Sequence, residues 1–200
     1  MPESEIADSY SAISDSYIRL FGSTAAVDAP DLVFLERHLG RREGVVVDAG
    51  CGPGHLTAYL SDRGVTIRGL DVVPAFVDNA RSNWPHLEFE VGSMRTLEVP
   101  DGTLGGILAW YALIHIEPTA LGNVLTEFRR AVAKGGVLVV GFFEGPEVEP
   151  FDHKVATAFR WPVDAMSHVL ATAGFTELER LSRPGHAGVR PHAALAARAE

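Results

Sequence analysis

Residues 45–54, VVVDAGCGPG, are the most informative segment of the sequence for the fold. Three consecutive β-branched residues favour a buried strand, and three glycines in five positions let the backbone turn tightly and come close to a ligand. Pro53 suits the first turn of a helix, which residues 55–60 continue with apolar side chains on one face, and Gly64 is a plausible C-terminal cap. The pattern predicts a strand, a ligand-binding loop and a helix, which together open a βαβ unit.

The charge beside this loop indicates which ligand it suits. A G-x-G-x-x-G loop receives a diphosphate at a helix N-terminus, but here the spacing is G-x-G-x-G and Asp48 stands two residues before the first glycine. A carboxylate at the strand end repels a diphosphate and attracts an ammonium or sulfonium group. The loop therefore favours a cationic nucleoside over NAD or ATP, which argues against an NAD-linked oxidoreductase. The alternative is a structural turn of the same composition.

Residues 47–54 resemble the first motif of the class I S-adenosylmethionine (SAM) dependent methyltransferases, in the small-molecule branch that shares the form D-x-G-C-G-x-G. The resemblance implies a Rossmann-like, doubly wound α/β fold with a seven-stranded sheet, mostly parallel with an antiparallel C-terminal strand. It also implies SAM as the cofactor. The cofactor residues that it implies in this motif are Asp48, Gly50, Cys51, Gly52 and Gly54.

Length and composition fit one domain over residues 1–200, with 46% hydrophobic and 22% charged residues. The net charge of −9 argues against a nucleic-acid or anionic-membrane partner, because both require clustered Lys and Arg. Residues 104–116 form the longest uncharged apolar run, which is too short to span a bilayer, and no export signal is visible. A single cysteine, Cys51, suits a cytoplasmic setting. We expect a small-molecule substrate, and a homodimer is possible.

Residues 1–27 are predicted to form a helical lid. Apolar side chains recur at steps of three and four along residues 3–21, which predicts one amphipathic helix. In the resembled family a Y-x6-Y pair covers the cofactor, and Tyr10 and Tyr17 have that spacing. The alternative is that both tyrosines only pack this helix onto the domain.

Residues 65–71 alternate as a second strand that also ends in an acid, Asp71. An acidic side chain at this strand tip is placed to accept hydrogen bonds from a ribose diol, with Val72 against the adenine ring. A solvated strand-end acid is the alternative. A third strand is predicted at 87–91. After it, the resemblance implies an acidic residue that binds the adenine amino group, but this sequence has Ser93 there. The backbone of Met94 is therefore expected to bind the amino group, and the alternative is that Met94 only packs in the core.

The remaining segments alternate between strand and helix. The apolar strand at 104–110 ends in Ala109 and Trp110, where the resemblance implies backbone contacts to the methionine portion of SAM. Patterning predicts further helices at 28–40, 74–83, 118–135 and 162–174, and further strands at 137–143, 175–181 and 189–197. Residues 144–161 show no period and are predicted to form an ordered substrate-side loop.

Methyl transfer from a sulfonium is an in-line displacement, so the protein must chiefly align the nucleophile with the methyl group. A hydroxyl acceptor also needs a base, for which His115 is preferred because it follows the fourth strand and titrates near neutral pH. His153 is next, and Tyr111 and Glu144 are further candidates. His186 and His192 are expected at the surface, and no metal-ligand spacing is visible.

The sequence therefore predicts a SAM-dependent methyltransferase (EC 2.1.1.-) of small molecules, with oxygen the preferred acceptor and nitrogen the second. The alternative is a SAM-binding protein that does not transfer methyl groups and serves as a sensor, partner subunit or other catalyst.

Overall fold

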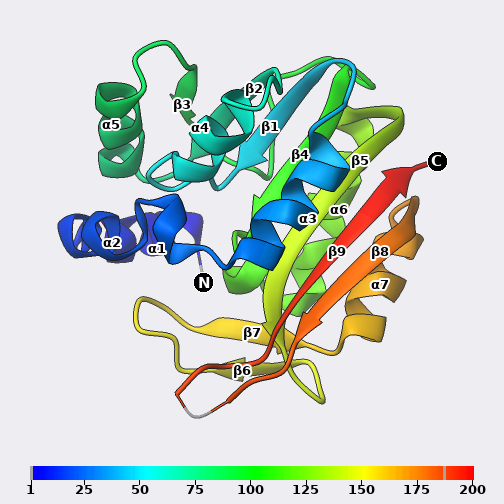
Figure 1. The fold of residues 1–200 in the computed structure, drawn as a ribbon. Helices are drawn as coiled ribbons and strands as arrows, with labels where there is room; N and C mark the ends of the chain where they lie inside the picture. The colour runs from blue at the N-terminus through cyan, green and yellow to red at the C-terminus, as the bar shows by residue number, and fades with distance from the viewer. Residues whose placement is uncertain (1, 187) are drawn as a thin grey trace.

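A computed structural model describes residues 2–186 and 188–200. Its centre is one twisted sheet with the order β3-β2-β1-β4-β5-β7-β6, in which β9 also pairs with β5, and β8 pairs with β9 (Figure 1). The strands are β1 (Val45–Ala49), β2 (Ile67–Asp71), β3 (Phe89–Val91), β4 (Leu104–Trp110), β5 (Val132–Glu144), β6 (Glu149–Phe151), β7 (Ala158–Trp161), β8 (Phe175–Arg183) and β9 (His192–Ala199).

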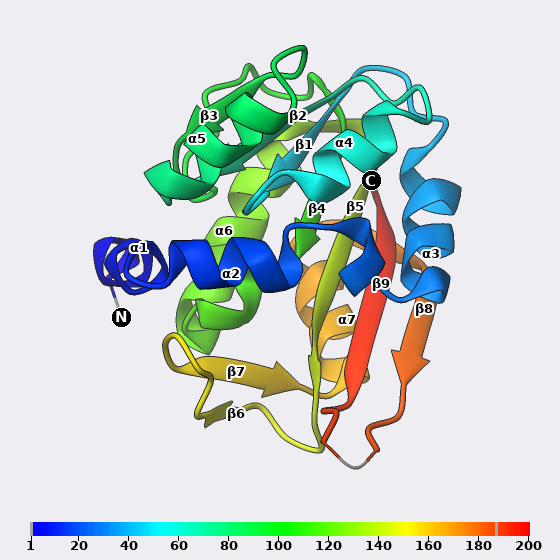
Figure 2. The same ribbon diagram turned by 60° about the vertical axis from the view of Figure 1, so that its left-hand side comes forward.

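Helices cover both faces of the sheet (Figures 1 and 2). One apolar cluster joins α3 and α4 to the side chains of one sheet face, and a larger one joins α6 and α7 to the other face. The helices are α1 (Glu3–Ser11), α2 (Ser14–Phe21), α3 (Ala29–Leu39), α4 (His55–Ser61), α5 (Pro74–Asn83), α6 (Pro118–Ala131) and α7 (Val163–Thr172), with short 3-10 turns η1 (Thr24–Ala26) and η2 (Leu113–His115).

The predicted fold class is confirmed. The five strands from β1 to β5 are parallel, and β9 runs antiparallel to both β5 and β8. Since the carboxyl ends of β1, β2 and β4 meet at one edge, the loops that follow Ala49, Asp71 and Trp110 lie together there.

Three predicted segments differ in the structure. The single helix expected at 3–21 is two helices, because the backbone at Ile13 leaves the helical region with ψ 9°. The segment 144–161 is not irregular throughout, since β6 and β7 pair with each other and add two strands to the predicted seven. Helix α6 ends at Ala131, before the predicted stop at Gly135, because β5 already begins at Val132.

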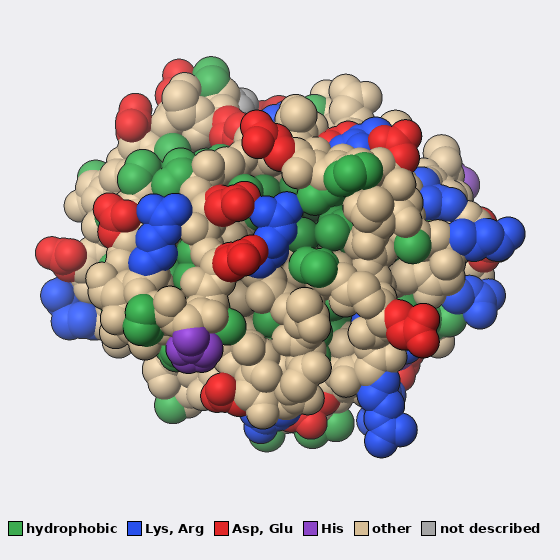
Figure 3. Space-filling view, turned by 90° about the horizontal axis from the view of Figure 1, so that it is seen from above, with side chains coloured by type: hydrophobic (Ala, Val, Ile, Leu, Met, Phe, Trp, Pro, Cys, Tyr) green, Lys and Arg blue, Asp and Glu red, His purple; other side chains and the backbone are tan. Residues whose placement is uncertain are grey.

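The face at which the parallel strands begin is seen from above in Figure 3, where acidic and basic side chains lie side by side over the surface. The opposite edge of the sheet, below the glycine loop, is where α1 and α2 approach the domain (Figures 1 and 2). The site described next lies at that edge.

Candidate functional site

The glycine loop after β1 has a backbone that favours glycine. Gly50 and Gly52 have φ values of 82° and 52°, in the left-handed region. A Cβ on Gly50 would lie 2.5 Å from Cβ of Ala112, so the loop after β4 approaches it closely. A Cβ on Gly52 would meet no atom within 4 Å, and Gly52 lines the cavity described below. The loop thus leaves a bare backbone surface open to a ligand.

Asp71 lies at the tip of β2, directly beside this loop. Its Oδ2 accepts a hydrogen bond from the Gly52 N–H at 2.7 Å, and its Oδ1 accepts one from the Val73 N–H at 2.9 Å. Burial raises its pKa to about 6, against the opposing effect of these backbone hydrogen bonds. Each carboxylate oxygen keeps a second lone pair, so Asp71 can still accept hydrogen bonds from a ligand.

Asp48 has a different position from the one that the sequence argument expected. It is only 2% exposed, does not line the cavity, and its Oδ2 accepts a hydrogen bond from the Thr57 hydroxyl at 2.7 Å. Alternation along β1 puts its side chain on the same face as Val46, which is the face that α4 covers. Burial raises the pKa of Asp48 to about 7. The carboxylate therefore anchors α4, and the structure does not show it in contact with the cavity.

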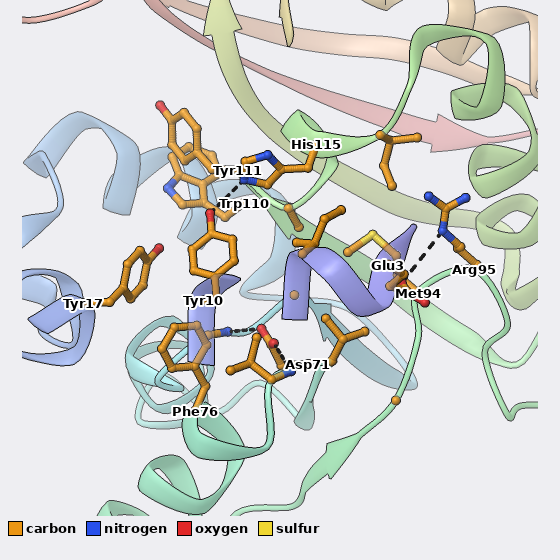
Figure 4. Close-up of a pocket in the computed structure, with 18 residues that line it drawn as sticks. Glu3, Tyr10, Tyr17, Asp71, Phe76, Met94, Arg95, Trp110, Tyr111 and His115 are labelled. Atoms are coloured by element: carbon orange, nitrogen blue, oxygen red, sulfur yellow. Dashed lines mark hydrogen bonds and ion pairs between the residues drawn. The ribbon is translucent and has the colours of Figure 1, made fainter. Parts of the chain in front are cut away.

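Helices α1 and α2 cover the loop with aromatic side chains. The rings of Tyr10 and Tyr17 meet edge to face at 5.4 Å between centroids, and they lie 5.9 Å and 5.0 Å, respectively, from the ring of Phe76. Burial raises the pKa of Tyr17 to about 12 and raises that of Tyr10 as well. In Figure 4 the Tyr10 hydroxyl points at His115, and Tyr17 lies beside Tyr10 on the side away from Glu3. The structure thus brings the Y-x6-Y pair over the loop.

His115 is held at both ring nitrogens. Its Nδ1 lies 2.8 Å from the carbonyl oxygen of Thr157, which can only accept, so Nδ1 carries the proton. Its Nε2 lies 2.9 Å from the Tyr10 hydroxyl and therefore accepts from it in the neutral ring. Burial lowers the pKa of His115, while the hydrogen bond to Thr157 opposes this effect. At neutral pH the ring is neutral, and its acceptor nitrogen faces Tyr10 of α1.

Tyr111 and His192 form a second hydrogen-bonded pair, with the Tyr111 hydroxyl 2.6 Å from Nδ1 of His192. Tyr111 has φ 54°, an uncommon conformation for a non-glycine residue that often marks a functional site. His192 is half-buried, and burial lowers its pKa to about 4, so the expectation of a surface residue was wrong. The cause is strand register, because β9 places His192 opposite Phe143 of β5. His186 is exposed, as expected.

His153 lies beside His115, with 5.4 Å between ring centroids, and also near the rings of Phe143 and Phe151. Its Nδ1 is buried with no hydrogen-bond partner among residues 2–186 and 188–200, and burial is the largest of the effects that lower its pKa to about 4. Phe159 and Trp161 belong to the apolar core instead of a pocket wall. The segment 144–161 therefore contributes His153 and Phe151 to the surroundings of His115, and packs the rest of its aromatic residues inside.

A cavity of about 90 Å³ lies among these groups (Figure 4). Sequence-predicted residues that line it are Tyr10, Tyr17, Gly50, Gly52, Asp71, Val72, Met94, Trp110, Tyr111 and His115. Predicted residues outside its lining are Asp48, Cys51, Gly54, Ser93, Ala109 and His153. Cys51 instead packs with Val77, Ala80 and Phe89 beneath α5, and burial raises its thiol pKa.

The sequence reasoning missed several lining residues, including Glu3, Phe76, Arg95 and Ala112. Phe76 carries a local signal, since it lies in the first turn of the helix that follows Asp71. Glu3 carries none, because it reaches the site only through the docking of α1.

Within residues 2–186 and 188–200, no group of three or more His, Cys, Asp or Glu side chains is arranged to hold a metal ion. In the same part of the chain, no helix is both long and apolar enough to cross a membrane.

Comparison with known proteins connects this geometry to a family. A model of the methyltransferase domain matches residues 46–136, which run from β1 to the start of β5. A demethylmenaquinone methyltransferase of Beutenbergia cavernae is 32% identical over 115 residues, which are 57% of this chain and 47% of the relative. A magnesium-protoporphyrin O-methyltransferase of Rhodobacter capsulatus is 31% identical over 100 residues, which are 48% of this chain and 44% of the relative. The chain thus matches about half the length of these relatives.

Solved structures agree in fold. A Burkholderia thailandensis 1,6-didemethyltoxoflavin-N1-methyltransferase with bound S-adenosylhomocysteine (SAH) superimposes with a TM-score of 0.78 and 22% identity, over 100% of this chain and 91% of the other. A [4+2]-cyclase superimposes with a TM-score of 0.73 and 17% identity, over 85% and 80% of the two chains. The chain therefore has the Rossmann-like fold of the methyltransferases with which it superimposes, and its residues 46–136 match the methyltransferase domain model.

Proposed function

We propose that this protein is a SAM-dependent methyltransferase that methylates an oxygen, or a nitrogen, of a small molecule. The observation that carries the proposal is the junction between Gly52 and Asp71, where a bare backbone loop and a buried carboxylate line one cavity under two tyrosines. An adenosine ligand needs an acceptor for its ribose diol and a backbone that lets it approach, and these residues fit both needs. The named relatives support a small-molecule acceptor.

The cofactor, when bound, supplies an activated methyl group on sulfur. The residues of this chain would hold it, exclude water and accept a proton from a hydroxyl acceptor. His115 is the proposed base because its Nε2 is unprotonated and faces the cavity. In the structure the Tyr10 hydroxyl donates a hydrogen bond to that nitrogen, and we propose that the hydroxyl of the acceptor replaces it.

Further expectations from the sequence belong to this proposal. Residues 1–27 act as the lid of a single domain, and the protein works in the cytoplasm on a small molecule, with a homodimer as the oligomeric state to test. The net charge of −9 supports the exclusion of nucleic acid.

Calorimetry with SAM and SAH tests the cofactor assignment. We expect binding in the micromolar range for the wild type, and a loss of about 100-fold for Asp71→Ala, because two hydrogen bonds to a charged acceptor are removed. Asp62→Ala, which removes an exposed acid at the end of α4, is the matched control. Undiminished affinity of the Asp71→Ala variant would contradict the assignment.

A second candidate function is SAM binding without methyl transfer. The structural similarity to a cyclase and the occupied Nε2 of His115 favour it. A screen of metabolites with methyl-labelled SAM distinguishes the two functions: a labelled product supports the methyltransferase, and binding without any labelled product supports the alternative.

A further inference from the structure

A polar cluster lies at the end of the cavity away from the tyrosines. It consists of Glu3 from α1, and of Ser93 and Arg95 from the segment after β3. The Ser93 hydroxyl donates to Oε1 of Glu3 at 2.9 Å, and Arg95 Nε lies 3.9 Å from the same oxygen. Ser93 in turn accepts a hydrogen bond from the Arg95 N–H at 3.0 Å. These contacts join residues 90 positions apart in the chain and fix where the carboxylate of Glu3 lies.

The cluster lies at one end of the proposed nucleoside site. Glu3, Met94 and Arg95 line the cavity at one end, Tyr17 and Phe76 lie toward the other, and Asp71 lies between them (Figure 4). Val72 and Ile6 add apolar side chains to the same lining. A ribose held by Asp71 would therefore place its base between apolar walls, with the base edge toward Glu3.

Glu3 brings an acidic group to a place where the local segment has none. Residues 92–94 are Gly, Ser and Met, so they offer no carboxylate. Ser93 and Arg95 both approach Oε1 of Glu3, whereas Oε2 has no hydrogen-bond partner in the part of the chain that the structure describes. The Glu3 side chain is also largely shielded, with 27% of its surface exposed.

An ionised carboxylate accepts hydrogen bonds and donates none. It therefore discriminates between purine bases by the group at position 6: an amino group donates to it, and a carbonyl oxygen is repelled. Adenine has the amino group, and hypoxanthine has the carbonyl.

We propose that Glu3 accepts a hydrogen bond from the exocyclic amino group of the adenine ring, so that the N-terminal helix supplies the base-specificity residue of the cofactor site. This inference rests on the proposed SAM binding. Helix α1 then both covers the site and contributes a binding residue to it, because Glu3 and Tyr10 lie on the same short helix.

Calorimetry on the full chain with two ligands tests the role of Glu3. The ligands are SAH and S-inosylhomocysteine, which differ in the amino or carbonyl group at position 6 of the base. We expect the wild type to prefer SAH by about tenfold or more, the effect of one hydrogen bond to a charged group. In Glu3→Ala the affinity for SAH should fall by a similar factor while that for S-inosylhomocysteine stays unchanged or rises, so that the preference disappears.

Two further variants separate recognition from helix docking. Glu5→Ala removes an exposed acid from the same helix turn and should leave both affinities unchanged. Ser93→Ala removes the hydrogen bond that positions Glu3 but keeps the carboxylate, so the preference for SAH should shrink yet stay larger than in Glu3→Ala. Thermal unfolding of each variant confirms that it is folded.

The outcomes are distinct. An equal loss for both ligands in Glu3→Ala would show that Glu3 only docks α1, and would overturn the inference, as would an unchanged preference. Failure of the wild type to bind either ligand would overturn the cofactor assignment itself and the role of Glu3 with it. A preference for SAH that Glu3→Ala abolishes and Glu5→Ala keeps would establish the inference.

Discussion

His115 is the residue on which the proposed proton transfer depends. Its Nδ1 donates to Thr157 and its Nε2 accepts from Tyr10, so α1 and the segment 144–161 both contact one imidazole. This arrangement fixes the tautomer that a general base needs. It also gives α1 a direct contact with the proposed base.

Replacement of His115 and Tyr10 tests this arrangement, with an acceptor from the labelling screen. His115→Ala should lower kcat by about 10²–10⁴-fold with little change in SAH affinity, the range expected for a lost general base. Tyr10→Phe should retain transfer, since the acceptor hydroxyl takes the place of the phenol. Because burial lowers the pKa of His115, the wild-type rate should decline with acid only below pH 6.5.

Exposed His86 provides the control, since His86→Ala should leave the rate unchanged. A fully active His115→Ala variant would contradict the role of the base. A Tyr10→Phe variant as inactive as His115→Ala would indicate that the phenol relays the proton.

Asp48 makes the stability of the protein depend on pH, because its carboxyl group is buried. Its pKa is raised from 3.8 to about 7, so the folded state holds a proton that the unfolded state releases. Stability from this group is present below the unfolded pKa and is lost as pH rises to about 7. Asp48→Asn removes the titration and keeps an acceptor for Thr57.

We therefore expect Asp48→Asn to gain stability relative to the wild type between pH 5 and 7, with a slope of up to about 1.4 kcal/mol per pH unit. Urea unfolding at several pH values measures the difference. In the control Asp62→Asn, which changes an exposed acid, the free energy of unfolding should vary with pH as it does in the wild type. Parallel curves for Asp48→Asn would show that the buried carboxylate does not titrate in this range.

At the scale of elements, α1 and α2 depend on the domain for their stability. They have 9 and 8 residues and no side-chain hydrogen bond at either N-cap, and isolated helices this short are marginal in water. Their docking uses Glu3, Ile6 and Tyr10, while Leu20 and Phe21 remain 65% and 49% exposed. The two helices are thus held by a few contacts at the cavity.

The cavity of about 90 Å³ is small beside ligand sites, which typically measure about 300–1,000 Å³. We therefore propose that α1 and α2 form a closed lid and move to admit the ligand. We expect SAH to slow amide hydrogen exchange in residues 3–21 strongly while exchange in β5 and β9 stays unchanged, as mass spectrometry can measure. Equal exchange with and without SAH in residues 3–21 would contradict the lid.

At the scale of the molecule, parallel β1, β2 and β4 gather the loops of three distant segments at one edge, and α1 closes that edge from the N-terminus. The antiparallel β9 has a further effect, because it brings His192 to Tyr111 across the sheet. The exclusion of nucleic acid, metal independence and the possible homodimer stay predictions from composition and motifs.

The parallel sheet, its glycine loop and the carboxylate at the tip of β2 could all be predicted from the amino-acid sequence. These follow from local patterning, since β-branched runs, glycine spacing and strand-end acids act over a few residues. Local patterns together with the family resemblance also predicted that Asp71, Gly52 and Tyr10 line one ligand site.

Which side chains meet in the cavity depends on the packing of distant elements. Asp48 turns to α4 because of its face on β1, His192 is buried because of the register of β9, and Glu3 reaches Ser93 because α1 docks across the loop. Each of these depends on contacts between residues far apart in the chain. No local pattern carries that information, because the free energy that fixes such contacts comes from the packing of whole elements.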